Sequence, residues 1–385
     1  MSRRIGDIEV LRALAVLAVV VHHINGNLTP FQAPGLPWPL IQLGGWFGVD
    51  LFFAISGFVI ARDLIPRMNA CGGWRESLSV AQAFWVRRIW RLLPSAWLWL
   101  ALTLLAVVAF NKSGVFGLLQ DNLQATLAGT LNFANVRFAH CFMRCEYGAS
   151  FVYWSLSLEE QFYLIFPLLI FLSRRYLPVV LLLLIAVQVL QARTLWLMAF
   201  RTDALAMGVL LAIWSRKPSF IAWKPAMVSR ISLLAPALLL AGMATLAYLA
   251  STYAQGLVYR VGVIALVSAL LVWLASYDQD WFCRSAPLRR FMLWLGARSY
   301  GVYLIHVPVY FFVRELHFRL FPEAAVDTRS YIIGAFALAL VLIAALAELN
   351  FRFVEMPLRR RGARIADDIT RRPQALSQAP LGQPD

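Results

Sequence analysis

The sequence contains few charged residues and few cysteines, and each shortage excludes a class of protein. Asp, Glu, Lys and Arg account for 14% of the 385 residues, whereas hydrophobic residues account for 61%. A soluble domain carries about 25% charged residues, so this composition excludes an ordinary soluble fold. The chain has only four cysteines, and none has other metal ligands at the usual spacing. We therefore expect no metal site.

Acidic residues are scarcer than basic ones, which gives a formal net charge of +15. A strongly basic chain can bind nucleic acid, but no basic and aromatic module of a known nucleic-acid-binding kind is present. In a membrane protein, the same excess arises when basic loops stay on the cytoplasmic side. We therefore predict no nucleic-acid partner.

The apolar residues occur in long runs that suit membrane-spanning helices, which need about 17–25 residues each. Because these runs recur along the whole chain, the sequence predicts an all-α, polytopic integral membrane protein with about ten transmembrane helices. The predicted spans lie near residues 8–24, 45–61, 92–110, 151–173, 176–190, 195–214, 231–250, 258–275, 291–313 and 331–353.

The distribution of Lys and Arg predicts the orientation of these spans. With the N-terminus inside, 23 of the 35 basic residues fall in inner segments, 7 in outer segments and 5 within spans. Both termini are then cytoplasmic. We predict a membrane domain over residues 1–358 and a disordered cytoplasmic tail over residues 359–385. This topology places Cys141 and Cys145 outside, where a disulfide between them is permitted but not required.

Ionisable residues recur at a similar depth in the outer half of five predicted spans. Such residues are costly in a bilayer and indicate function by default. Their shared depth predicts one polar cavity in the outer half of the bundle. They are His23, Asp50, Glu159 with Glu160, Arg201 with Asp203, and His306.

A second cluster lies at the predicted cytoplasmic side. The stretch FWVRRIWRLLPSAW places Arg88 and Arg91 on one helical face, and Arg12 lies about one turn into the first span from the same side. Guanidinium groups suit phosphate because they offer paired planar donors. Arg12 and His23 are eleven residues apart, or roughly 16 Å along one helix. This arrangement suits a donor with phosphates and a long arm, such as an acyl thioester of coenzyme A.

These residues fall in blocks that resemble the acyltransferase-3 family of membrane O-acyltransferases. Arg12 and His23 fit the family's basic-x10-His pattern, and RRIWRLLP fits its Arg-x-x-Arg motif. His22 departs from the family, whose members more often carry an aromatic or apolar residue there. Further blocks follow in the family's order: GGWFGVDLFFAISGFVI, YWSLSLEEQFYLIFP, RTDALAMGVLLA, GARSYGVYLIHVPV and FVEMPLRR.

The resemblance implies transfer of an acyl group, expected to be acetyl, from cytoplasmic acetyl-CoA or another acyl-CoA to a hydroxyl. The implied acceptors are envelope glycans such as lipopolysaccharide O-antigen or exopolysaccharide, or lipid-linked sugars. The implied location is the bacterial inner (cytoplasmic) membrane. Acyl-CoA is a donor substrate, so no permanently bound cofactor is expected.

His23 is the candidate general base, because imidazole suits proton abstraction from a hydroxyl near neutral pH. We expect Asp50 or Glu159 to orient its ring. An acyl-His23 intermediate is the open alternative. We expect Arg12, Arg88 and Arg91 to bind the donor. The remaining candidates for substrate contacts are Trp154, Ser155, Arg201, Asp203 and His306, of which the last three also suit buried structural pairs.

Two other classes of function fit the sequence less well. Ten spans with charges near the membrane midplane also describe a transporter of a glycan precursor or small solute, but no internal repeat links the two halves. A membrane sensor could use the His22–His23 pair as a pH switch. The oligomeric state does not follow from the sequence.

Overall fold

The computed structural model describes residues 5–142, 144–231 and 233–377, and the regular elements in these ranges are helices. The longer helices are α1 (Gly6–His22), α3 (Phe47–Asn69), α4 (Trp74–Ala109), α7 (Tyr153–Ser173), α8 (Leu177–Val189), α10 (Asp203–Trp214), α13 (Leu234–Leu249), α14 (Arg260–Ala275), α15 (Ala286–Leu320), α16 (Arg329–Asn350) and α17 (Met356–Ser377). The shorter ones are α2 (Trp38–Gln42), α5 (Leu119–Thr130), α6 (Ala134–Cys141), α9 (Leu195–Ala199), α11 (Pro218–Ala222) and α12 (Ala226–Arg230).

The predicted all-helical fold is confirmed. Every predicted span overlaps a helix, and within the described residues four stretches are long and apolar enough to cross a membrane. The number of ten spans and their orientation remain predictions. The four stretches are Trp74–Ala109, Tyr153–Val189, Leu195–Trp214 and Arg329–Arg371.

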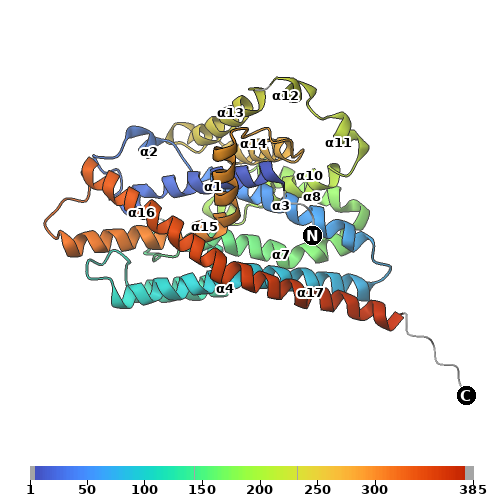
Figure 1. The fold of residues 1–385 in the computed structure, drawn as a ribbon, viewed down its shortest axis with the longest axis horizontal. Helices are drawn as coiled ribbons and strands as arrows, with labels where there is room; N and C mark the ends of the chain where they lie inside the picture. Colours follow the sequence, from blue (N-terminus) through green and yellow to red (C-terminus); the bar gives the residue numbers. More distant parts are fainter. Residues whose placement is uncertain (1–4, 143, 232, 378–385) are drawn as a thin grey trace, which may run out of the picture.

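The bundle is arranged around α1 and α3, which hold several of the predicted site residues. In Figure 1, α1, α3, α7 and α4 run lengthwise beside one another, and α17 extends along α4. Helix α1 packs against α3, α14 and α15, and α3 also packs against α10. The α3–α10 contact depends on glycine: a Cβ on Gly57 would lie 2.1 Å from the Leu205 carbonyl oxygen, and one on Gly208 would lie 2.2 Å from that of Ala54. Small residues allow helices in membranes to approach this closely.

Helix α1 ends where the predicted site begins. His23 caps α1, and Ile24–Leu28 form a turn in which Asn25 and Gly26 have non-helical backbone angles, with a φ of 88° at Gly26. Backbone of this kind favours glycine, which has no Cβ to clash. The chain therefore leaves the helix axis directly after the candidate base.

Two expectations about the elements differ from the structure. The range 195–214 is not one helix: α9 and α10 are separated at residues 200–202, where the Gln188 side chain accepts hydrogen bonds from the backbone N–H groups of Thr202 (2.8 Å) and Asp203 (3.2 Å). The tail from Arg359 is helical as far as Ser377, because α17 packs against α4. Residues 378–385 of the predicted disordered tail lie outside the described residues.

Candidate active site

The three predicted donor-binding arginines line one cavity between α1, α3, α4, α7 and α15. Arg12 comes from α1, and Arg88 and Arg91 come from neighbouring turns of α4. A second cavity shares Arg12 and Arg91 with the first, so the two adjoin. Glu9, Arg62, Glu355 and Arg359 line the second cavity at the end of the bundle predicted to face the cytoplasm.

No described carboxylate forms an ion pair with these arginines, although Glu9, Glu159 and Glu355 line the same two cavities. Among the described residues, none of the three forms an ion pair or donates a hydrogen bond, and Nε of Arg12 is buried without a partner. The Arg88 guanidinium lies over the Tyr163 ring, with Cζ 5.3 Å from the ring centroid. Unpaired cationic donors that line a cavity favour an anionic ligand, because a buried charge requires a partner.

Glu159 lies in the same cavity but is already hydrogen-bonded. Its Oε1 accepts hydrogen bonds from the Ser56 hydroxyl of α3 and from the Tyr163 hydroxyl one turn along α7. Tyr163 also contacts Ser56, with 3.1 Å between the hydroxyl oxygens. Glu159 therefore joins α3 to α7 beside the arginines.

His23 is paired with the other predicted imidazole. Its Nδ1 lies 2.8 Å from Nε2 of His306, although the two residues are 283 positions apart in the sequence. The rings are nearly parallel, with an interplanar angle of 18° and centroids 5.0 Å apart. The His306 ring is fully buried, and its Nδ1 lies 2.7 Å from the Tyr303 carbonyl oxygen.

A pair of hydroxyl groups connects the arginine cavity to the histidine pair. Ser155 and Tyr303 both line the cavity, and their hydroxyl oxygens are 2.7 Å apart. Tyr303 precedes His306 by one helical turn, and their ring centroids are 5.7 Å apart. The cavity thus reaches from the unpaired arginines to the residue whose carbonyl contacts His306.

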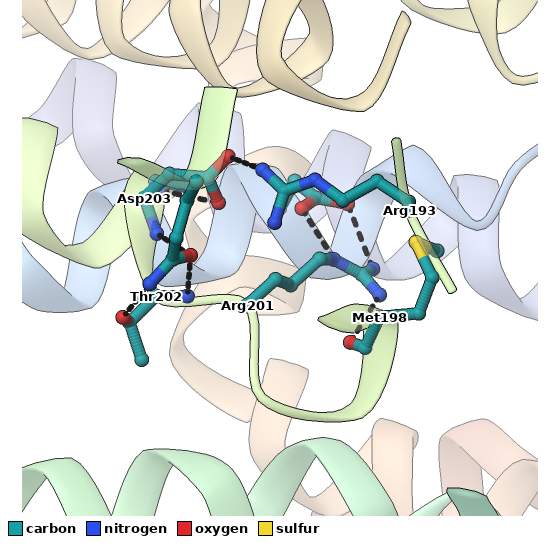
Figure 2. A network of polar contacts seen from close by, with 8 residues as sticks. Arg193, Met198, Arg201, Thr202 and Asp203 are labelled. Atoms are coloured by element: carbon teal, nitrogen blue, oxygen red, sulfur yellow. Dashed lines mark hydrogen bonds and ion pairs between the residues drawn. The ribbon is translucent and has the colours of Figure 1, made fainter. Parts of the chain in front are cut away.

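Asp50 and Arg201 form a separate buried pair. Arg201 donates two hydrogen bonds to the Asp50 carboxylate, from Nε at 2.8 Å and from Nη2 at 2.9 Å, and a third from Nη1 to the Met198 carbonyl (Figure 2). Both side chains are at most 2% exposed. The Arg201 Cζ also lies 4.8 Å from the centroid of the Trp154 ring. Asp203 is paired with Arg193 (Figure 2).

The expected arrangement is therefore correct in part. The structure brings His23 to His306, Asp50 to Arg201, and Glu159 to the three arginines. These groups have separate hydrogen-bond partners, and the partner of the His23 ring is His306 instead of Asp50 or Glu159. The orienting role expected of Asp50 or Glu159 stays a prediction, and in the structure each carboxylate is hydrogen-bonded to other side chains.

The sequence reasoning missed three side chains of this region: Ser56, Tyr163 and Tyr303. The two tyrosines each have a helical signal. Tyr163 lies four residues after Glu159, and Tyr303 lies three residues before His306, so both share a face with a predicted site residue. Ser56 carries no local signal, because its partner is on another helix.

The fold and this site define a helical membrane protein with an arginine-lined cavity that leads toward the His23–His306 pair. A family model described as an acyltransferase domain, acyltransferase 3, matches residues 5–348. The chain belongs to this acyltransferase family.

Named relatives cover most of this chain. The chain is 26% identical over 388 residues to the O-acetyltransferase OatA of Staphylococcus aureus, covering 94% of this chain and 58% of the relative. It is 29% identical over 390 residues to the peptidoglycan O-acetyltransferase OatA of Listeria monocytogenes, covering 92% and 56%. The chain thus spans just over half the length of these curated relatives. No solved structure matches it significantly.

Proposed function

We propose that this protein is a membrane O-acyltransferase that transfers an acetyl group from acetyl-CoA to a hydroxyl of a cell-envelope glycan. The observation that carries the proposal is the set of unpaired arginines Arg12, Arg88 and Arg91, which line one cavity and leave cationic donors for a phosphate-bearing ligand. Family membership supports the reaction class, and the names of the relatives support a glycan acceptor.

In this proposal, the acyl-CoA phosphates bind the arginines and the thioester extends toward Ser155 and Tyr303. His23 removes the proton of the acceptor hydroxyl, whose oxygen attacks the thioester carbonyl. The carbon–sulfur bond then breaks, and the CoA thiolate takes up the proton from His23. Direct transfer needs no enzyme-bound acyl group. With an acyl-His23 intermediate, the same overall reaction would take place in two transfer steps.

The test is transfer of label from acetyl-labelled acetyl-CoA into alkali-labile ester in membranes that contain the protein. Envelope glycans are supplied separately as peptidoglycan, lipopolysaccharide O-antigen and exopolysaccharide, so that the acceptor is identified by which one gains label. We expect label with the wild type and none with His23→Ala. Absence of label with every acceptor would contradict the proposal, and equal label with His23→Ala would remove His23 from the mechanism.

A matched pair of variants tests the donor site. Arg88 lines the cavity, whereas the adjacent Arg87 forms a partly exposed ion pair with Asp367. Loss of a charge-assisted hydrogen bond costs about 1.5–3 kcal/mol, or roughly 10- to 150-fold. We expect Arg88→Ala to raise the KM for acetyl-CoA by that factor and Arg87→Ala to leave it within about twofold. Equal KM values for the two variants would contradict the assignment of the cavity.

A further inference from the structure

His306 has two hydrogen-bond contacts that together determine which ring nitrogens carry protons. Its Nδ1 lies 2.7 Å from the Tyr303 carbonyl oxygen, and its Nε2 lies 2.8 Å from Nδ1 of His23. A carbonyl oxygen only accepts, so Nδ1 of His306 carries the proton. In a neutral imidazole, the other nitrogen is then a bare acceptor.

The position of the proton on His306 determines the position of the proton on His23. Because Nε2 of neutral His306 is an acceptor, Nδ1 of His23 carries the hydrogen, and Nε2 of His23 keeps its lone pair. The small angle of 18° between the rings lets this hydrogen bond lie close to both ring planes. The lone pair on Nε2 of His23 is what a general base requires.

The surroundings hold this arrangement in place. His306 is fully buried in α15, with the rings of Tyr303 and Tyr310 at centroid distances of 5.7 and 6.0 Å. Tyr310 donates a 2.7 Å hydrogen bond to the Val20 carbonyl and so joins α15 to α1 just before His23. No described carboxylate hydrogen-bonds to either imidazole ring.

We infer that His306 is a positioning residue that fixes the tautomer and ring orientation of His23. The acidic residue has the same role in serine-type triads. The inference rests on the proposed function for its catalytic consequence, but the tautomer itself does not depend on any activity. His306 then acts through His23 and does not contact the acceptor.

Three variants separate this role from a purely structural one. In His306→Gln, Oε1 occupies a place equivalent to Nε2 and still accepts from His23. In His306→Asn, the shorter amide reaches the Tyr303 carbonyl but not His23. Tyr153→Phe is the structural control, because it removes a buried 2.9 Å hydrogen bond from α7 to the Ala96 carbonyl, whereas the two histidines lie at the end of α1 and in α15.

We expect His306→Asn to lower kcat on the order of 10²–10⁴-fold, with KM values for acetyl-CoA and acceptor changed less than about threefold. His306→Gln should stay within roughly tenfold of the wild-type kcat, and Tyr153→Phe should match the wild type. Equal kcat values for the Asn variant and the wild type would overturn the inference. Equal losses in the Asn and Gln variants would overturn it too, because they would show that packing alone matters.

The second measurement is the ¹⁵N NMR spectrum of histidine-labelled protein in detergent near neutral pH. The chain contains five histidines, and the signals lost in His23→Ala identify His23. We expect His23 to have a protonated Nδ1 and a bare Nε2 in the wild type. The opposite tautomer would overturn the inference even if His306→Asn fails to fold. If the wild type forms no ester, the proposed function fails while this spectrum still decides the role of His306.

Discussion

Asp50 shows at the residue scale how a charge is accommodated inside this bundle. Its carboxylate accepts two hydrogen bonds from the Arg201 guanidinium, and neither side chain is more than 2% exposed. Removal of one partner from such a pair leaves an uncompensated buried charge, which costs about 3–5 kcal/mol. The geometry therefore favours a structural role for this pair.

We predict that Asp50→Asn lowers the free energy of unfolding by about 3–5 kcal/mol, measured by denaturation in detergent micelles. The control is Asp63→Asn, which breaks an exposed pair with Arg67 in the same helix and should cost at most about 1 kcal/mol. A stable Asp50→Asn protein without transfer activity would instead support the catalytic role expected from the sequence.

The sequence predicted the residue types of the site better than their pairing. His23 and Asp50 are conspicuous because ionisable groups are rare in apolar runs. Their partners are 283 and 151 positions away, respectively, in segments that meet only through tertiary packing. Nothing local to His23 or Asp50 indicates which of several polar groups at one depth will be the neighbour.

At the scale of elements, the contact between α3 and α10 depends on two small residues. A Cβ on Gly57 would clash with backbone, which cannot move away as a flexible side chain can. We predict that Gly57→Ala lowers the free energy of unfolding by about 1–3 kcal/mol.

The matched control is Gly334→Ala in α16, where nothing lies within 4 Å of the added Cβ. Alanine there should be neutral or stabilise the helix by up to about 1 kcal/mol. The same denaturation assay measures both, and equal effects would contradict the close approach.

Hydropathy located the apolar middle of each helix but not its polar ends. Helix α4 begins at Trp74, well before the predicted span at residue 92, and α15 extends beyond its predicted span at both ends. The helical tail was missed for a related reason. Its arginine-rich sequence resembles a solvated segment, and packing against α4 gives α17 a partner that the sequence does not indicate. Arg87–Asp367 is one of the contacts between them.

For the whole molecule, the predicted orientation can be tested at two glycines. Gly73 lies in a predicted inner loop and Gly256 in a predicted outer loop, and an added Cβ would meet nothing within 4 Å at either. In a background carrying Cys71→Ser and Cys283→Ser, we expect a membrane-impermeant maleimide to label Gly256→Cys in intact cells. Gly73→Cys should react only after the membrane is permeabilised. The reverse pattern would invert the predicted topology.

The disulfide between Cys141 and Cys145 suits the same predicted outer side, where oxidising conditions prevail.

Helix α1 has a further consequence for the whole molecule, because Arg12 and the capping residue His23 belong to one uninterrupted rod. The rise of the helix sets their separation at roughly 16 Å, and no substitution of a side chain would change it. The helix therefore fixes this distance, and a substrate that contacts both Arg12 and His23 must span it. One residue inserted between them would increase this separation by only about 1.5 Å but would turn His23 by about 100° around the helix axis relative to Arg12. The spacing of these two residues is thus a constraint on direction more than on distance.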